Sequence, residues 1–347
     1  MTGLFTNTIA ESTSGSGITF SNDIVPATPL SHRNMIINGA MQVAQRGTSF
    51  TGFGASVNYS LDRFFTYHNS DGAFTISQES SVVPTGFKNS LKILITTADS
   101  SLTASQRLIV GTRLEGNTVS HLNFGTANAE TVTLSFYVRS SITGTHGGAI
   151  NNGSDNRSYP FTYIISSADT WERKSITIAG DQTGTWATDN GRSLQVIWGL
   201  GAGTSFSASA GSWGAGDISS ATGATTAVLG TINSTWYLSG VQLELGSVAT
   251  PFEHRSYADE LRRCHRYFER FTGPNMHGAL YNGSTYLVSW HFKERKRTRP
   301  AIQNITGSGM AAHVSSTGDN GGTDSCYFNS GNGSYVISCD ANAEFVA

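Results

Sequence analysis

The sequence predicts an all-β protein, and three observations support that fold class. About ten short segments rich in β-branched and aromatic residues recur along the chain, separated by turns of Gly, Ser, Asn and Asp. Charged residues make up only 13% of the 347-residue chain, whereas glycine accounts for 39 residues, as a protein with many tight turns requires. The strands do not alternate with helices in sequence, which argues against a parallel α/β sheet.

The first 33 residues form a segment of their own. They mix short β-branched stretches with Ser and Gly, and they hold too few apolar side chains to build a core. Such a segment is either a disordered tail or an extended stretch that orders against a partner or against other copies of the chain. The apolar residues near its centre favour ordering: Ile18, Phe20, Ile24 and Val25.

Residues 34–255 are expected to form the main domain, an antiparallel sandwich or barrel. In the clearest strand, residues 131–140, apolar residues such as Val132 and Leu134 alternate with residues such as Thr133 and Ser135. One face of this strand should therefore be buried and the other solvated. The other predicted strands are 61–68, 73–80, 90–97, 106–114, 161–166, 172–180, 193–201, 226–232 and 235–245.

One amphipathic helix is predicted over residues 256–272. Ser256 is a suitable N-cap with Asp259 three residues later, arginines follow toward the C-terminal end, and Gly273 and Pro274 should end the helix. Its apolar residues are spaced alternately by four and three positions, as in a stripe of two heptads. The stripe either covers the chain's own sandwich or lines the axis of an oligomer. Its residues, the candidate contacts along such an axis, are Tyr257, Leu261, Cys264, Phe268 and Phe271.

Residues 273–347 are β-rich again and predict a smaller C-terminal β domain. Residues 293–299, KERKRTR, hold five basic residues, which form either a solvated strand end or a patch that faces an anion such as an acidic glycan. The chain has three cysteines, an odd and low number that fits assembly in a reducing cytoplasm. Cys326 and Cys339 are either two free thiols, as that compartment favours, or a disulfide formed later between neighbouring strands.

Several functional classes are disfavoured. The net charge of −2 and the lack of a recognised binding motif argue against nucleic acid as a partner. The sequence has no run of about 18 apolar residues for membrane insertion, and its N-terminus lacks the basic and apolar regions of a signal peptide. Motifs of nucleophile-elbow hydrolases, zinc proteases, dithiol sites and nucleotide-binding loops are missing, so we expect neither enzyme activity nor a cofactor.

Acidic side chains offer few catalytic candidates, since Asp and Glu together number 24. A glycosidase needs two carboxylates across a cleft, which the sequence alone does not pair. The candidates lie in turns or at strand ends, where turn formation or solvent exposure explains them. Oxygen ligands of this kind also leave a structural calcium ion as an alternative, with no other metal expected. These residues are Asp181, Asp189, Asp217 and Glu244.

Aromatic residues beside short polar residues give the candidate binding site. An exposed ring stacks on the apolar face of a sugar, while Asn and Asp side chains bind its hydroxyl groups. Two stretches have this composition: residues 181–192, and residues 211–217 within a long Gly-, Ser- and Ala-rich loop at 201–224. Loops that long are usually functional or mobile. Each tryptophan is either a glycan contact or part of the packed core. The candidate glycan-binding residues are Trp186, Asp189, Asn190, Trp213 and Asp217.

Several longer motifs carry a resemblance to a known family. They are GAMQVAQRGT (39–48), YSLDRFF (59–65), residues 124–163, TWERKSITIAGDQTGTW (170–186) and VQLELGSVATPFEHRSYADELRRCHRYFER (241–270). In these motifs the chain closely resembles a recurrent module of bacteriophage tail-fibre and related virion-fibre proteins, especially those of marine and cyanobacterial phages. The resemblance covers about residues 34–270. Residues 7–24 are similar to short segments at the virion-proximal ends of phage fibres, where three chains wind together.

The resemblance implies a jelly-roll sandwich, similar to carbohydrate-binding modules, in a homotrimeric fibre without a catalytic residue set. Our first hypothesis is a phage tail fibre that attaches to a bacterial surface polysaccharide, with residues 1–33 bound to other virion proteins. The second is an architectural head fibre, capsid decoration or adaptor. The third, a tailspike glycan depolymerase, lacks the β-helix repeats of such spikes. In each case we expect assembly in the host cytoplasm and exposure on the virion.

Overall fold

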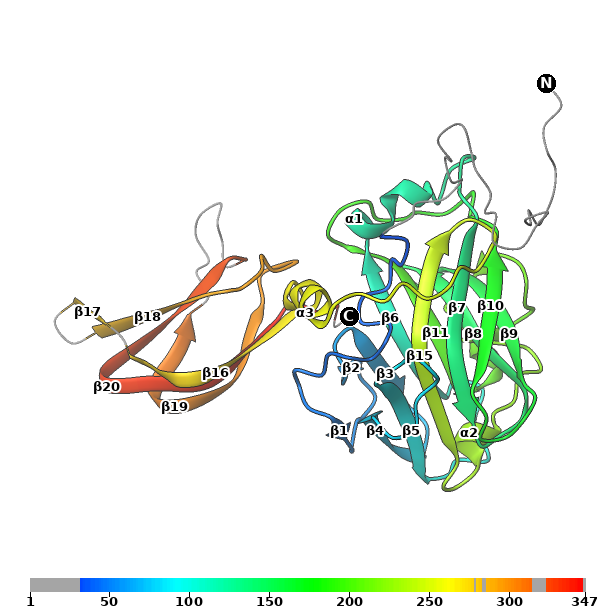
Figure 1. Cartoon of the computed structure of the whole chain (residues 1–347), viewed down its shortest axis with the longest axis horizontal. Coiled ribbons are helices and arrows are strands. Elements are labelled where there is room, and N and C mark those ends of the chain that lie inside the picture. Colours follow the sequence, from blue (N-terminus) through cyan, green and yellow to red (C-terminus); the bar gives the residue numbers. More distant parts are fainter. Residues whose placement is uncertain (1–31, 278, 283–284, 314–322, 346–347) are drawn as a thin grey trace, which may run out of the picture.

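The computed structural model describes residues 32–277, 279–282, 285–313 and 323–345. It confirms the predicted fold class, an all-β jelly-roll sandwich followed by a helix and a smaller β domain (Figure 1). The C-terminal domain lies beside the sandwich, and helix α3 (Tyr257–His265) lies where the two meet. The expected anchor at residues 1–33 lies, apart from its last two residues, outside the described residues.

One sheet of the sandwich has six antiparallel strands in the order β1–β4–β5–β15–β7–β10. Strand β15, the last of the sandwich in sequence, pairs with β5 on one side and β7 on the other. It therefore lies near the centre of the sheet. The strands are β1 (Ser49–Phe50), β4 (Ala73–Glu79), β5 (Ser90–Thr97), β7 (Val132–Ser140), β10 (Glu172–Ile178) and β15 (Thr235–Leu245).

The facing sheet has seven antiparallel strands in the order β13–β9–β8–β11–β6–β3–β2. Short helical turns, α1 (Gly116–Val119) and η1 (Ser120–Leu122), follow β6 at one end of the sandwich. The strands are β2 (Asn58–Tyr59), β3 (Phe64–His68), β6 (Arg107–Glu115), β8 (Gly144–Asn152), β9 (Arg157–Ile165), β11 (Arg192–Ala202) and β13 (Gly214–Ala215).

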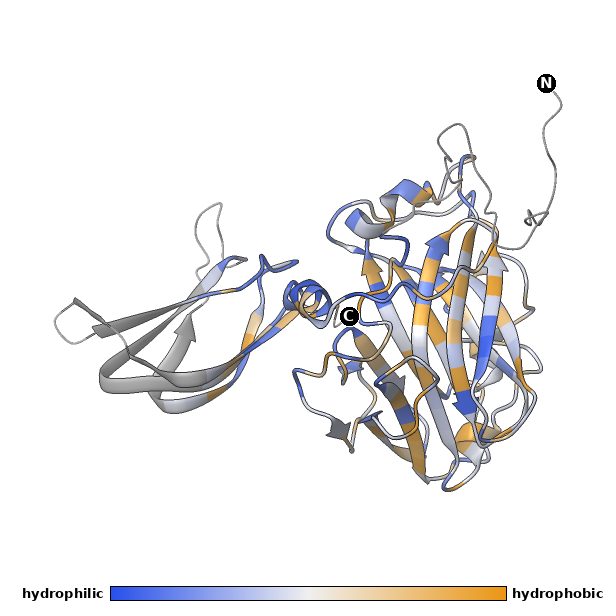
Figure 2. Ribbon diagram, in the orientation of Figure 1, coloured by the Kyte–Doolittle hydropathy of each residue, from blue (hydrophilic) through white to orange (hydrophobic). Residues whose placement is uncertain are grey.

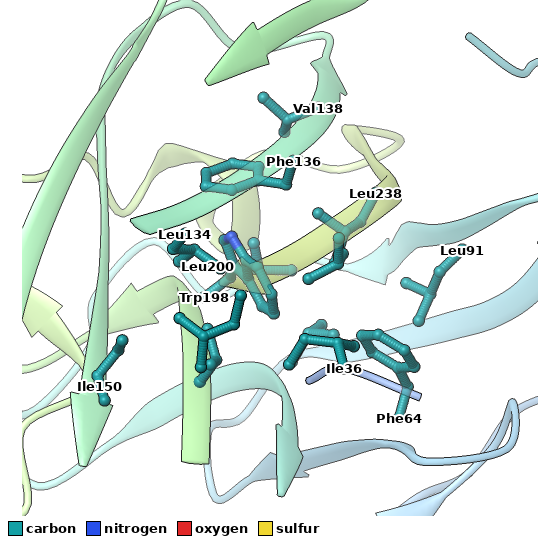
Figure 3. Close-up of a cluster of buried hydrophobic side chains, with 14 of the residues drawn as sticks. Ile36, Phe64, Leu91, Leu134, Phe136, Val138, Ile150, Trp198, Leu200 and Leu238 are labelled. Atoms are coloured by element: carbon teal, nitrogen blue, oxygen red, sulfur yellow. The ribbon is translucent and has the colours of Figure 1, made fainter. Parts of the chain in front are cut away.

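The two sheets enclose one apolar core (Figure 3). Because strand residues alternate between faces, Trp198 of β11 and Phe136 of β7 both point inward, and their ring centroids lie 5.5 Å apart. The indole N–H of Trp236 donates to the hydroxyl of Tyr163 at 3.2 Å within the same core. Fully burying a large apolar side chain contributes about 1.5–3 kcal/mol. The apolar bands along the sandwich strands in Figure 2 follow the same alternation.

The outer face of β7 differs from the expectation. The prediction of a solvated face is wrong for Thr133 and Ser135, which are buried. The chain that leaves β15 folds back over this face, and the carbonyl of Gly246 accepts a hydrogen bond of 2.7 Å from the Thr133 hydroxyl. Thr250 fixes the returning chain by donating its hydroxyl to Glu244 at 2.6 Å. Polar residues on the outer face of the sheet therefore form hydrogen bonds that hold the chain segment after β15.

The predicted strand at residues 226–232 is also wrong. Its central residues form one helical turn, α2 (Ala227–Gly230). Val228 and Leu229 are both fully buried in the core, whereas a strand would send consecutive side chains to opposite faces. A helical turn brings both to the core.

Strand β8, by contrast, was not predicted, because it contains few large apolar residues. Its glycines are required by close neighbours. A Cβ on Gly147 would lie 2.2 Å from the Ser220 hydroxyl oxygen, and one on Gly148 would lie 2.4 Å from the Ile197 carbonyl oxygen. The strand therefore needs glycine at these positions so that the neighbouring chain can approach closely.

The long loop at 201–224 is bound to the seven-stranded sheet. It contains η2 (Thr204–Phe206), β12 (Ser207–Ala208) and β14 (Ser220–Ala221), of which β12 and β14 pair in parallel, and it includes β13. The amide of Gly216 donates to the Asn156 carbonyl at 3.0 Å, and the amide of Ile218 donates to the Ser158 hydroxyl at 3.1 Å. These bonds hold the loop against β9 and the turn that precedes it.

Helix α3 is shorter than predicted. Ser256 caps it as expected, accepting a hydrogen bond of 3.1 Å from the Asp259 amide. The prediction that the helix continues to residue 272 is wrong, because Phe268 begins strand β16 (Phe268–His277), which pairs with β20. Gly273 and Pro274 lie where this ladder shifts register, a position that suits a residue without an N–H. Long-range strand pairing has overridden the helical spacing.

The C-terminal domain is a five-stranded antiparallel sheet in the order β16–β20–β18–β17, with β19 also paired to β20. Cys264 and Cys339 are buried. The side chain of Cys326 lies outside the described ones, so the two alternatives for Cys326 and Cys339, free thiols or a disulfide, both stay predictions. Among the described helices, none has the length and apolar character needed to cross a bilayer. The remaining strands are β17 (Ala279–Asn282), β18 (Thr285–His291), β19 (Ala301–His313) and β20 (Ser325–Asn342).

A buried histidine predicts how stability depends on pH. The His146 ring stacks on Tyr163 with 5.4 Å between centroids, and its Nε2 lies 3.0 Å from the Ile142 carbonyl oxygen. Burial lowers the pKa of His146, although the hydrogen bond to Ile142 acts in the opposite direction. The histidine therefore binds a proton more readily in the unfolded chain than in the folded one. Its contribution to the free energy of unfolding is present above the unfolded pKa of about 6.5 and is lost as the pH falls through the pKa of the folded state.

We expect the free energy of unfolding, measured by urea titration, to fall from neutral to mildly acidic pH, and to fall less in His146→Gln. The matched control is His121→Gln, because His121 is exposed and should leave the pH dependence unchanged. If the stability of His146→Gln depended on pH as that of the wild type does, His146 would not be the group responsible.

Candidate functional site

The two predicted tryptophans lie together. The rings of Trp186 and Trp213 meet edge to face with 5.5 Å between centroids, and both also contact Phe124. Their indole N–H groups are already occupied: Trp213 donates to the Ala179 carbonyl at 2.7 Å, and Trp186 donates to Asp181 at 3.3 Å. Both rings are half-buried against the sandwich core. The pair therefore mainly closes the margin of the core.

The polar residues predicted beside them do not converge on this pair. Asp217 forms an ion pair of 2.7 Å with Arg107, which projects from the face of β6 opposite the core. Asn190 donates to the Arg297 carbonyl of the C-terminal domain at 2.7 Å. Asp189 accepts the Gly191 amide at 2.8 Å within a turn. Of the five candidate glycan-binding residues, Trp186 and Trp213 are thus in contact, and the three polar ones do not form one site with them.

The predicted trimer stripe is divided in the same way. Cys264 and Phe268 are buried inside their own chain, so neither side chain faces another copy. The Phe271 ring lies 5.9 Å from Trp290 within the C-terminal domain. Tyr257 is 55% exposed and Leu261 is partly exposed. Of the five candidates, these last two remain on the outer surface of α3.

A buried charge pair joins the sandwich to the C-terminal end of the chain. Residues 343–345 return to the sandwich beside α3 (Figure 1), where the Glu344 carboxylate binds the Arg63 guanidinium. Both side chains are almost fully enclosed, and Arg63 also lies 3.4 Å from the centroid of the Tyr267 ring. Burial alone would lower the pKa of Arg63, but Glu344 together with Tyr267, Tyr59 and Cys264 outweighs it and holds this pKa above its usual value. The arginine is therefore charged and depends on Glu344.

A second buried pair uses part of the basic stretch 293–299. Lys296 donates to Glu269 at 2.6 Å and to the His265 carbonyl at 2.5 Å, and it is 1% exposed. Burial lowers the pKa of Lys296, and Glu269 partly offsets that effect. Arg297 donates to the carbonyl oxygens of Ala343 and Asn190 at 2.9 Å each. Neither alternative for the basic stretch, a solvated strand end or an anion-facing patch, fits these two residues. Lys296 joins β16 to the end of α3, and Arg297 joins the C-terminal domain to the sandwich.

The two domains enclose a cleft of about 440 Å³, which we call the interdomain cleft. Its sandwich wall is formed by residues before and in β2, and its other wall by β19 and β20. The Arg46 guanidinium forms part of the floor, stacked 3.6 Å from the centroid of the Phe268 ring. Beside it, Arg270 binds both oxygens of Asp340 at 2.7 and 2.8 Å. The residues used below are Phe50, Asn58, Tyr59, Gln303, Asn304 and Asp340.

The interdomain cleft is lined by polar side-chain amides and by an aromatic ring. Asn304 donates to Asp340 at 2.8 Å, which leaves its amide oxygen without a hydrogen bond to the described residues. Gln303 accepts a bond of 3.4 Å from Asn342, and its own NH₂ group donates to none of them. Both amides are exposed to the cleft. Together with the partly exposed Phe50, they provide donors, acceptors and an aromatic ring, as polyhydroxyl ligands require.

Sequence reasoning missed this cleft because its walls are far apart in the chain. Gln303 and Asp340 lie opposite each other only through the pairing of β19 with β20. The short amide-rich stretches around residues 303 and 341 are visible in the sequence, but nothing there gives their register. In the described part of the chain, no cluster of three or more His, Cys, Asp or Glu side chains is placed to hold a metal ion such as calcium.

Comparisons with known proteins give likeness in shape only. No family model and no curated protein matches the chain. A putative sugar binding protein from Bacteroides thetaiotaomicron aligns with a TM-score of 0.36 and 11% identity, over 62% of this chain and 100% of that one. The carbohydrate-binding module TmCBM61, in complex with β-1,4-galactotriose, gives 0.32 and 8%, over 62% and 99%.

The enzymatically active domain of tailspike protein 4 from bacteriophage CBA120 gives a TM-score of 0.33 and 9% identity. The match covers 61% of this chain and 21% of that one. Likenesses at these TM-scores carry no argument about function, which has to rest on the residues of this chain.

Removing the charge of Glu344 should loosen the junction between the domains. Glu344→Gln leaves the Arg63 guanidinium buried without its counter-charge, a change that costs about 3–5 kcal/mol. We expect a lower free energy of unfolding in urea and faster proteolysis between the domains.

The control for this experiment is Glu294→Gln. Its partner Arg262 has a side chain that is 74% exposed, so the free energy of unfolding should fall by less than about 1 kcal/mol. Similar losses in the two variants would show that the buried pair has no special role.

Proposed function

We propose that this protein is a non-enzymatic, glycan-binding fibre protein of a bacteriophage virion. The observation that carries the binding role is the interdomain cleft, in which the Asn304 amide oxygen and the Gln303 amide nitrogen make no hydrogen bond to the described residues and lie beside aromatic rings. Its volume of about 440 Å³ falls in the range of sites that hold small ligands. The place in a virion is supported by the long motifs that resemble phage fibre proteins.

Sugar hydroxyl groups suit this cleft better than an apolar ligand would. Each hydroxyl both donates and accepts, so sugar hydroxyls can accept from the NH₂ of Gln303 and donate to the amide oxygen of Asn304, neither of which is bonded to the described residues. Phe50 offers an apolar ring face for the C–H groups of a sugar. Asp340 is already bound by Arg270 and Asn304, so it serves to position the amide.

The fibre role adds a partner and an oligomeric state. On the resemblance, three copies form a homotrimer in which residues 1–33 bind other virion proteins, and the sandwich and C-terminal domain face the host. Three weak glycan sites on one particle would act together and raise the overall affinity. Such a protein is assembled in the host cytoplasm and exposed on the virion, on the tail or on the head. Locating it by cryo-electron microscopy of intact particles tests this placement.

The cleft is tested by removing its amides without disturbing the backbone. Asn304 has a φ of +52°, so Asn304→Gly keeps a conformation that glycine adopts freely, and Gln303→Ala removes an exposed side chain. On an array of bacterial surface polysaccharides, we expect the double variant to bind about tenfold more weakly, since it loses two or more hydrogen bonds.

The matched control is Asn128→Ala, an exposed amide on the sandwich whose side chain makes no hydrogen bond to the described residues. It should bind like the wild type. An array on which the wild type binds no polysaccharide would favour a purely architectural protein, and release of reducing ends from any glycan would favour a depolymerase.

The homotrimer has its own test on the exposed part of α3. Tyr257→Asp and Leu261→Asp place a charge on the outer surface of the helix, where the sandwich fold does not depend on them. If this surface lines the trimer axis, light scattering should show the mass falling from three chains to one. Trimers that persist in both variants would show that α3 serves only its own chain.

A further inference from the structure

A second cleft lies beside α3 and has a different character. It has a volume of about 620 Å³ and is lined by the first turns of the helix and by the chain that leads into it. Four arginines and three carboxylates line it, with few apolar groups. The ribbon of α3 is largely blue in Figure 2, which reflects this polar surface. We call it the α3 cleft.

All three carboxylates of the α3 cleft are already engaged. Glu253 accepts the amides of His32 and Asn34 at 2.5 and 2.9 Å. Asp259 accepts the Ser256 hydroxyl at 2.6 Å, which caps the helix. Glu294 accepts Arg262 at 2.6 Å. None of the three forms a hydrogen bond or an ion pair with Arg263 among the described residues, although Glu253 and Asp259 lie near enough to act on its charge.

Three of the four arginines are paired as well. Arg255 binds Glu260 at 2.9 Å, and Arg266 binds both oxygens of Glu115 at 2.7 and 3.0 Å. Arg262 binds Glu294, as described above. Among the described residues, Arg263 forms neither a hydrogen bond nor an ion pair, although it is only partly exposed. Burial lowers the pKa of Arg263 and the nearby charge of Arg255 adds to this effect, whereas Glu260, Glu253 and Asp259 oppose it.

We propose that the α3 cleft binds a singly charged acidic saccharide, with Arg263 as the contact to its carboxylate. This inference rests on the proposed function and adds the class of sugar to it. The planar guanidinium matches a carboxylate with two parallel hydrogen bonds, so one acidic group would neutralise the one unpaired cation. The volume is much larger than a small inorganic anion needs, and it leaves room for the sugar ring.

The three carboxylates help to select the ligand. They repel a phosphate group with two charges more strongly than a group with one charge. Their remaining lone pairs also accept hydrogen bonds from neutral sugar hydroxyls. A uronic acid combines one carboxylate with several hydroxyls, and it therefore fits this mixture of one free cation and several acceptors.

The test compares one oligosaccharide in two forms. The full chain is titrated calorimetrically with a glucuronate-containing oligosaccharide and with its carboxyl-reduced, neutral counterpart. We expect the acidic form to bind about tenfold more tightly, as one charge-assisted hydrogen-bonded pair implies, and to lose this advantage at high salt. In Arg263→Gln the two forms should bind equally.

Arg295→Gln is the matched control, since that side chain is 68% exposed, is paired with Asp324 and does not line the α3 cleft. It should keep the preference for the acidic form, as should the variant with changes at Gln303 and Asn304. Equal binding of both forms by the wild type, or a preference that survives Arg263→Gln, would overturn this proposal alone. Failure of the wild type to bind either oligosaccharide or any polysaccharide on the array would instead overturn the proposed function.

Discussion

The contact on which the rest of this structure depends is the buried pair between Arg63 and Glu344. It joins the sandwich to the last described residues, and the backbone of those residues is bound on both sides, by Tyr59 at 3.2 Å and by Arg297 at 2.9 Å. A buried charge tolerates little displacement of its partner, because each is costly to leave alone. The junction therefore holds the two domains in one arrangement. Because each domain forms one wall of the interdomain cleft, this arrangement also sets the distance between the walls.

Two clefts flank this junction, and their chemistry differs. The interdomain cleft offers neutral amides and aromatic rings. The α3 cleft offers Arg263, which has no hydrogen-bonded partner among the described residues, beside carboxylates that already accept hydrogen bonds. A ligand that carried both neutral and acidic sugars would meet suitable groups at both places. The sandwich itself contributes mainly rigidity: its tryptophans at positions 186 and 213 close the core margin, and their N–H groups are used internally.

The sequence predicted the fold class and most sandwich strands, because the alternation of apolar with other residues is a local pattern, as in residues 132–138. It failed where a distant partner decided the outcome. Residues 268–272 have helical spacing but pair with β20, and strand β8 has glycine where the chain at Ser220 approaches. The candidate site failed for the same reason: Gln303, Asn304 and Arg263 become neighbours of clefts only through tertiary contacts. Tryptophan-rich composition pointed to rings that the fold uses for packing.

The return of residues 343–345 to the sandwich has a consequence for biosynthesis. Arg63 leaves the ribosome early, but its counter-charge is made about 280 positions later, so the nascent sandwich must wait with this arginine unmatched. During that interval the arginine stays hydrated and the surface around it open. The junction can thus close only after Glu344 has been made, and a chain interrupted before residue 344 would leave Arg63 without this counter-charge.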